Sequence, residues 1–218
     1  LVGDAKIVFA ALAEAPITID TSEWLRELEE KKHSTVDLRR FSDKLVNPVE
    51  LVKLLSEKME DDAIYVADVG QNQLWSADNY VMKRGRFLTS GGMGTMGYSI
   101  PAAIGAKFAA PERQVVAVCG DGSFQMSLYE LGTIAVEKLP VKILIMKNRF
   151  LGLVREYQAK PYSRRYEAVE LFDYPRYSHI AAAYDMAYFH CDNNAALGET
   201  LGAFLACETA ALMVCAVD

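Results

Sequence analysis

Two short polar motifs, each following an apolar run, could together hold a metal-bound diphosphate. Gly120-Asp121-Gly122-Ser123 follows one run and Asn148 follows the next, with 25 residues between Gly122 and Asn148. Mg²⁺ prefers oxygen ligands and is usually held by one or two protein groups together with phosphate oxygens. Asp121 offers a carboxylate oxygen and Asn148 an amide oxygen. The flanking glycines allow backbone N–H groups to approach a phosphate closely.

The elements that must position these residues follow from the apolar pattern. Short apolar runs predict strands at 63–67, 87–88, 114–119, 141–147, 186–190 and 211–217. Helical periodicity predicts helices at 48–59, 73–82, 99–110, 124–138, 150–159, 176–184 and 194–206. This alternation predicts an α/β fold with a doubly wound parallel sheet and helices on both faces. Open sheets of this kind bind ligands at the carboxyl ends of their strands, where Asp121 and Asn148 would meet.

The first 45 residues have a different character. A helix start at Gly3-Asp4 is followed by a polar, charged stretch with one short helical segment near 24–31. The chain starts without Met and stops directly after an apolar run. We therefore expect a fragment of a longer protein. Residues 1–45 would be the tail of a preceding central domain plus a linker, and residues 46–218 the domain that carries the motifs.

Composition argues against several classes of protein. There are 23 Lys and Arg residues against 29 Asp and Glu, a net charge of −6, which disfavours a nucleic-acid partner. No apolar run reaches about 18 residues, so no membrane span is expected. The cysteines lie in apolar segments without CxxC spacing, as expected of buried thiols in a reducing, cytoplasmic compartment: Cys119, Cys191, Cys207 and Cys215.

Four further segments match a known family in the same order along the chain. They are residues 68–75, 92–98, 101–106 and 151–158. Together with the spaced GDG and Asn pair, they make the chain from about residue 45 to its end resemble the large, catalytic subunit of acetolactate synthases. The resemblance implies that this is their C-terminal thiamine-diphosphate-binding domain, with thiamine diphosphate and Mg²⁺ as cofactors. It also implies that the intact enzyme binds FAD, mostly outside this fragment.

The same resemblance implies a role for each site residue. Asp121, Asn148 and the backbone carbonyl of Phe150 would bind the metal. Met96 would wedge between the two rings of the cofactor, and the carbonyl of Gly94 would accept a hydrogen bond from its aminopyrimidine. The remaining expected cofactor-binding residues lie at the diphosphate end: Gln71, Asn72, Gly120, Gly122, Ser123, Leu151 and Gly152. Among these, the Ser123 hydroxyl would donate to a phosphate oxygen at the start of a helix.

The substrate channel would be bordered by Leu153, Val154 and Tyr157, where the family usually has Met, Val and Trp. Tyr157 is the clearest departure from the family pattern. Asn72 stands where many relatives have His, and we expect its amide still to donate to the diphosphate. Lys147 replaces the first Asn of a frequent Asn-Asn pair, whose second member is the metal ligand.

The implied activity is that of a transferase that condenses pyruvate with a second 2-oxoacid in branched-chain amino-acid biosynthesis. The choice between pyruvate and 2-oxobutyrate as the acceptor stays open. The resemblance places an activating Glu in the pyrimidine-binding domain of a second subunit, in a homodimer or homotetramer, and allows a small regulatory subunit. The fragment alone is therefore expected to be inactive.

Three alternatives stay open. The protein could be another 2-oxoacid carboligase or decarboxylase, or one subunit of a split thiamine enzyme. It could also be an NAD-binding Rossmann domain, because Gly92-x-Gly94-x-x-Gly97 matches the dinucleotide fingerprint between a strand and a helix, and Asp121 stands where a ribose-binding acid would lie. The NAD hypothesis leaves three residues without a role: Gln71, Gly122 and Asn148.

Overall fold

A computed structural model describes residues 2–34 and 44–217 of the chain, which divides into two units, residues 1–40 and 41–218. The first unit contains α1 (Ala5–Glu14) and α2 (Ser22–Ser34). The side chain of Asp4 caps α1 by accepting from the N–H groups of Lys6 and Ile7, as the Gly3-Asp4 start predicts. No residue of α1 is buried, so this helix has no core of its own.

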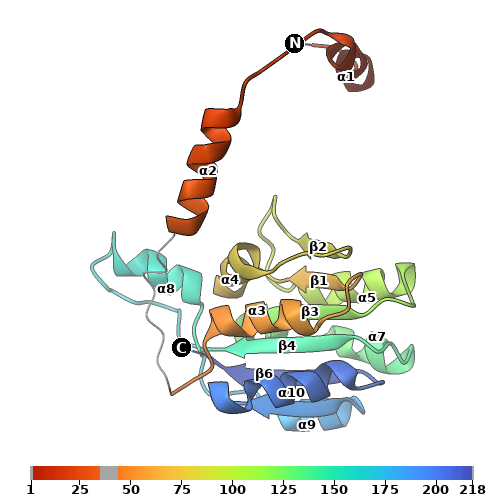
Figure 1. The fold of residues 1–218 in the computed structure, drawn as a ribbon. Coiled ribbons are helices and arrows are strands. Elements are labelled where there is room, and N and C mark those ends of the chain that lie inside the picture. Colours follow the sequence, from red (N-terminus) through yellow and green to blue (C-terminus); the bar gives the residue numbers. More distant parts are fainter. Residues whose placement is uncertain (1, 35–43, 218) are drawn as a thin grey trace. The chain divides into compact units, whose positions relative to one another are not determined.

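The second unit is built on a six-stranded sheet with the strand order β2-β1-β3-β4-β6-β5, in which all five pairings are parallel (Figure 1). The strands are β1 (Ile64–Ala67), β2 (Arg86–Thr89), β3 (Val115–Gly120), β4 (Lys142–Lys147), β5 (Ala187–Cys191) and β6 (Ala211–Ala216). The chain order reverses between β1 and β3. An open parallel sheet leaves a crevice at such a point, at the carboxyl ends of the strands.

Helices cover both faces of this sheet (Figure 1). One face carries α3 (Pro48–Lys58), α4 (Gln71–Asn79) and α10 (Asn194–Ala206). The other carries α5 (Ser99–Ala109), α6 (Asp121–Met126), α7 (Leu131–Val136) and α9 (Tyr177–Ala183). A further helix, α8 (Gly152–Ala159), follows β4 and has no buried residue.

Alternate residues of the central strands point into two separate cores. Val118 and Leu144 belong to the core under α3, α4 and α10, whereas Cys119 and Ile143 belong to the core on the opposite face. Each of these four side chains has no exposed surface. Burial on both faces explains why the strands are continuous apolar runs rather than alternating ones. The predicted doubly wound α/β fold is confirmed.

Two predicted helices of the second unit differ most from their observed bounds. The helix expected at 73–82 begins at Gln71 and ends at Asn79, because Tyr80 turns to an extended backbone and packs its ring, tilted, against those of Tyr65 and Phe87. The helix expected at 124–138 begins at Asp121, directly after β3. It breaks at Ser127, whose φ of −125° leaves the helical region, and a 3₁₀ turn (Leu128–Glu130) leads into α7.

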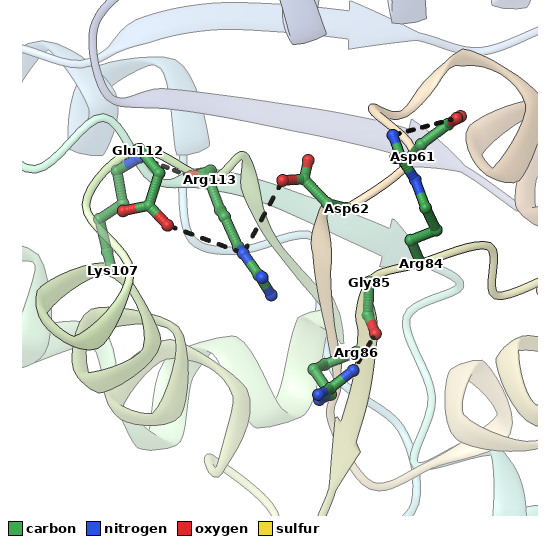
Figure 2. A network of polar contacts seen from close by, with 8 residues as sticks. All are labelled: Asp61, Asp62, Arg84, Gly85, Arg86, Lys107, Glu112 and Arg113. Carbon is green, nitrogen blue, oxygen red and sulfur yellow. Dashed lines mark hydrogen bonds and ion pairs between the residues drawn. The ribbon is translucent and has the colours of Figure 1, made fainter.

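Charged side chains gather at the amino edge of the sheet, where β1, β2 and β3 begin (Figure 2). Asp61 pairs with Lys83 and Arg84, at 3.1 and 3.6 Å, and Asp62 lies 3.8 Å from Arg113. The guanidinium of Arg84 is largely exposed. These contacts are therefore surface ion pairs, which contribute little to stability.

Across residues 2–34 and 44–217, none of the helices combines the length and the apolar character needed to cross a membrane.

Candidate functional site

The loops after β1, β2, β3 and β4 surround a cavity of about 210 Å³ at the carboxyl edge of the sheet. The GDG motif, Asn148 and three of the four family segments, 68–75, 92–98 and 151–158, meet here. The cavity is lined by all of the predicted metal and cofactor residues and by two of the three predicted substrate residues: Gln71, Asn72, Gly94, Met96, Gly120, Asp121, Gly122, Ser123, Asn148, Phe150, Leu151, Gly152, Leu153 and Val154. Tyr157 does not line it.

Asp121 is the buried acid of this cavity. It is the first residue of α6 and is 3% exposed. One carboxylate oxygen accepts from the backbone N–H of Arg149 at 2.8 Å. Burial raises the pKa of this carboxyl, while the N–H of Arg149 and the charge of Lys147 act in the opposite direction. A cation bound beside Asp121 would compensate the cost of burying its negative charge.

Asn148 lies at the end of the neighbouring strand, and its amide is already oriented by two contacts. Its Oδ1 accepts from the N–H of Phe150 at 2.9 Å, and its Nδ2 donates to Oε1 of Gln71 at 2.9 Å. A carbonyl oxygen has two lone pairs, so the bond from Phe150 leaves one available to a cation. In the part of the chain that the structure describes, no group of three His, Cys, Asp or Glu side chains is placed to hold a metal. A metal here would thus depend on Asp121, Asn148, backbone carbonyls such as that of Phe150, and oxygens of the ligand.

Gly122 is crowded on the cavity side. A Cβ atom at this position would lie 2.9 Å from Cδ2 of Leu151, 3.1 Å from Cδ1 of Leu171 and 3.5 Å from Cε of Met96. The absence of a side chain therefore lets three apolar side chains close over the backbone of the GDG segment. The same contact shows that Met96 reaches from its own loop to the turn that carries Asp121.

Gln71 closes another side of the cavity by lying across Gly152. A Cβ atom on Gly152 would be 1.8 Å from Oε1 of Gln71, so a larger residue here would displace the Gln71 side chain. Its Nε2 donates to Oε1 of Glu156 at 3.0 Å, while its Oε1 accepts from Asn148. Gln71, the first residue of α4, thus links this helix to the end of β4 and to α8 through one side chain.

Two residues expected to contact the diphosphate have hydrogen-bond partners within the protein. The Nδ2 of Asn72 donates to the backbone carbonyls of Asp68 and Val118, at 2.9 and 3.3 Å. Ser123 lies in the first turn of α6, at the start of a helix as expected. The Ser123 hydroxyl is held by the backbone N–H and carbonyl of Gly120, at 3.2 and 3.3 Å. Both residues line the cavity, but their donors are used within the protein.

The α8 side of the site is more open than the rest. Tyr157 is 64% exposed and packs its ring against Tyr162, with 5.8 Å between centroids. The Arg155 guanidinium lies over the rings of Phe150 and Tyr166, at 4.4 and 4.9 Å. Lys147 forms a close ion pair with Asp173, in the segment that follows α8. Aromatic and charged surface contacts, rather than core packing, hold this wall of the cavity.

Sequence reasoning gave no role to Asp68, which the structure places under the glycine loop. Asp68 has no exposed surface, and its carboxylate accepts from the N–H groups of Gly97 and Ser99 at 2.9 and 2.7 Å. The one signal in the sequence is an acid directly after an apolar strand and two residues before a glycine, Gly70. Because Ser99 is the first residue of α5, Asp68 occupies N–H groups that the dinucleotide fingerprint would offer to a pyrophosphate. This arrangement disfavours the NAD hypothesis.

Comparisons with known proteins agree with the arrangement of these loops. Residues 68–215 match the family model for the thiamine pyrophosphate enzyme, C-terminal TPP binding domain. The chain is 40% identical to a probable acetolactate synthase large subunit of Methanocaldococcus jannaschii, over 84% of this chain and 33% of that protein. It is 35% identical to the acetolactate synthase large subunit of Lactococcus lactis, over 92% and 35%, respectively.

A third relative, the acetolactate synthase large subunit of Corynebacterium glutamicum, is 42% identical over 78% of this chain and 28% of its own length. The chain thus spans about a third of the length of these relatives. The matched family region runs from the end of β1 to β6 and includes every loop around the cavity. The chain therefore belongs to the thiamine pyrophosphate enzymes, as a C-terminal TPP-binding domain.

Proposed function

We propose that this chain is the diphosphate-anchoring part of an acetolactate synthase large subunit. The intact protein would be a transferase that condenses pyruvate with a second 2-oxoacid in branched-chain amino-acid biosynthesis. The names of the relatives support this choice over other 2-oxoacid carboligases and decarboxylases. The observation that carries it is the meeting of Asp121, Gly122 and Asn148 at one cavity, with Met96 reaching over Gly122.

The residues present fit thiamine diphosphate bound through Mg²⁺. Asp121 would supply the negative oxygen ligand, and Asn148 and the carbonyl of Phe150 would supply neutral ones, a set suited to a hard cation. Gly122 has no side chain of its own, which lets Met96 and Leu151 pack directly over the GDG segment. When bound, thiamine diphosphate supplies the nucleophilic carbon and the electron sink that decarboxylation and carboligation of 2-oxoacids require.

The protein's own contribution would be to bind, orient and exclude water. Met96 and Leu151 close over Gly122 and give the cavity apolar walls beside the charged diphosphate end. Gly94 has a φ of +67°, which suits glycine and turns its peptide group in the loop beside the cavity. Leu153 and Val154 form the wall from α8, where an apolar 2-oxoacid side chain would lie.

The rest of the proposed enzyme lies outside this chain. We propose that a pyrimidine-binding domain of a second subunit completes the site in a homodimer or homotetramer and that it supplies the activating Glu. FAD, a small regulatory subunit and a cytoplasmic location belong to the same proposal. Support comes from the names and greater lengths of the relatives. The chain alone would then bind cofactor but form no acetolactate from pyruvate.

A titration of the purified chain tests the proposal. Thiamine diphosphate should quench or shift the fluorescence of Trp75, which lines the cavity, and this binding should require Mg²⁺. NADH serves as the competing ligand. Saturable binding of NADH, together with no response to thiamine diphosphate and Mg²⁺, would contradict the proposal and favour the Rossmann alternative. Acetolactate formation by the chain alone would contradict the need for a second subunit.

A further inference from the structure

Asp68 is a fully buried acid whose partners all lie in the backbone around the site. Its Oδ1 accepts from the N–H groups of Val69 and Gly97, at 2.8 and 2.9 Å, and its Oδ2 accepts from Ser99 at 2.7 Å. The backbone of Asp68 is itself fixed, because its N–H donates to the carbonyl of Val118 on β3 at 2.8 Å. Its carbonyl accepts from the Asn72 amide. Asp68 is therefore rigidly joined to the centre of the sheet.

The glycine loop between β2 and α5 depends on this anchor at its second end. Residues 91–95 are exposed, whereas Ser99 is fully buried. At the first end, the N–H of Gly94 donates to the carbonyl of Ser90, and that of Thr95 donates to the Ser90 hydroxyl, both at 3.0 Å. Met96 lies between these two sets of contacts and precedes Gly97 directly. The Asp68 bonds thus define where the Met96 side chain leaves the loop.

Asp68 fixes the surrounding backbone through hydrogen bonds and does not face the cavity as a ligand for a cofactor or metal. A carboxylate without exposed surface is costly to bury unless hydrogen-bond donors surround it, and three backbone N–H groups do so here. The N–H of Ser99 opens α5, where the helix dipole also favours a negative charge. Asp121 is different, because it lines the cavity beside the predicted metal ligand Asn148. The two acids end adjacent strands yet face different groups.

We propose that Asp68 is a positioning residue. It fixes the distance between Met96, in the glycine loop, and the GDG turn at Gly120–Gly122. This role separates binding of the cofactor's rings from binding of its diphosphate. The inference rests on the proposed function, because it takes thiamine diphosphate as the ligand. Met96, held in place by Asp68, would contact the rings, whereas Asp121 and Asn148 would hold the metal and the diphosphate. Weakening the hydrogen bonds of Asp68 should therefore reduce binding of the cofactor's rings and leave binding of its diphosphate unchanged.

The test compares two probes on the 218-residue chain and its D68N variant. The probes are thiamine diphosphate and inorganic diphosphate, each with Mg²⁺ and measured by calorimetry. In D68N an amide N–H₂ group replaces one acceptor and faces a backbone donor. We expect affinity for thiamine diphosphate to fall at least about tenfold, since charge-assisted bonds are lost. Affinity for magnesium diphosphate should change less than about twofold. Hydrogen exchange at the Gly97 and Ser99 amides should speed up in the same variant.

Two further variants keep the result interpretable. S76A removes a different buried polar group on α4, the hydroxyl 2.6 Å from that of Tyr65, and should not discriminate between the probes. S90A removes the half-buried hydroxyl that holds the first end of the same loop and leaves no cavity in the core. If D68N does not fold, S90A should still weaken thiamine diphosphate more than magnesium diphosphate, and equal losses would overturn the inference.

The possible failures are distinguishable. Equal weakening of both probes in D68N would overturn the inference and reduce Asp68 to a general stabilising residue. Unchanged exchange at Gly97 and Ser99 would also overturn it. If the wild-type chain bound neither probe, the proposed function itself would fail, and the positioning role with it.

Discussion

The two edges of the central sheet use the same residue types in opposite ways. At the amino edge, Asp61 and Asp62 pair with Lys and Arg side chains in water. At the carboxyl edge, Asp68 and Asp121 are buried and accept from backbone N–H groups of the loops around a cavity. An exposed pair is screened and contributes little, whereas a buried carboxylate fixes the backbone that surrounds it. Burial and the kind of partner decide which acids can shape a site.

Two lysines at the amino edge donate hydrogen bonds to backbone carbonyls of the loops. The Nζ of Lys142, at the start of β4, donates to the carbonyls of Pro140 and Thr209, at 3.2 and 2.7 Å. The Nζ of Lys107 donates to the carbonyl of Arg113 at 2.6 Å. Here side chains satisfy backbone carbonyls of the loops. At the carboxyl edge, by contrast, glycines of the loops line the cavity, so their backbone groups lie beside it. Changes at this edge should therefore alter ligand binding, and changes at the amino edge should alter stability alone.

The largest expected effect is that of D121A. This substitution removes the carboxylate of the proposed metal site, so we expect affinity for thiamine diphosphate with Mg²⁺ to fall at least about a hundredfold, because a charged ligand is lost. The fold should survive, since the buried charge is itself unfavourable. Calorimetric titration measures the affinity and circular dichroism the fold. D61A at the amino edge is the matched control and should bind as the wild type does. Equal affinities for D121A and D61A would remove the contrast between the edges.

G122A should show the importance of close packing at the carboxyl edge. Its new Cβ would lie 2.9 Å from Leu151 and 3.1 Å from Leu171, so these side chains must move. We expect a loss of about 1–3 kcal/mol in the free energy of unfolding, together with weaker cofactor binding. G105A is the control, because its Cβ would meet no atom within 4 Å in the middle of α5. A gain of about 0.5–1 kcal/mol is expected there. Urea unfolding of both variants decides the matter, and a stabilised G122A would disprove the packing argument.

K142M should lower stability without affecting binding. It leaves two carbonyls at the amino edge without their donor, at an expected cost of about 1–3 kcal/mol at neutral pH. Burial lowers the pKa of Lys142, so the unfolded chain holds this proton more tightly. Wild-type stability should therefore gain from Lys142 as pH rises from its lowered pKa toward the ordinary 10.5, and K142M should lack that gain. Urea unfolding at several pH values measures this difference. A changed affinity for thiamine diphosphate would contradict the separation of the edges.

R113A should have the smallest effect. Its Nε lies 3.8 Å from Asp62 and 3.7 Å from Glu112, and both acids are substantially exposed. We expect the free energy of unfolding to fall by less than about 1 kcal/mol, and the difference to shrink in high salt. Thermal melts at low and high ionic strength measure it. A loss that persists in high salt would mean that the network in Figure 2 has a structural role beyond surface charge.

The sequence predicted the sheet and the meeting of its motifs well. Buried parallel strands are continuous apolar runs, so β3 and β4 could be placed within a residue or two of their observed bounds. The carboxyl ends of parallel strands share one edge. From this rule alone, Asp121 and Asn148 could be predicted to lie close together, and the structure places both at one cavity.

The sequence did not predict the orientation of side chains, because this orientation depends on contacts between segments that are distant along the chain. The Asn72 amide turns to Val118, and the Asp68 carboxylate reaches Gly97 and Ser99, only once β1 pairs with β3 and the glycine loop folds back. The break after α6 is likewise set by packing: Phe124 and Leu131 on either side of it both enter the same core. Periodicity predicts the apolar face of this segment, but it does not show that the helix is interrupted.

The position of β6 has a consequence for how the chain is made. β6 comes later in the sequence than β4 and β5 but lies between them, with parallel pairing on both sides. During translation, β4 has an open edge and β5 has no neighbour until Ala211–Ala216 leaves the ribosome. Unpaired apolar strands are templates for aggregation. A chain released before this segment is made would therefore expose unpaired strands that chaperones bind. Insertion of β6 alone completes the sheet.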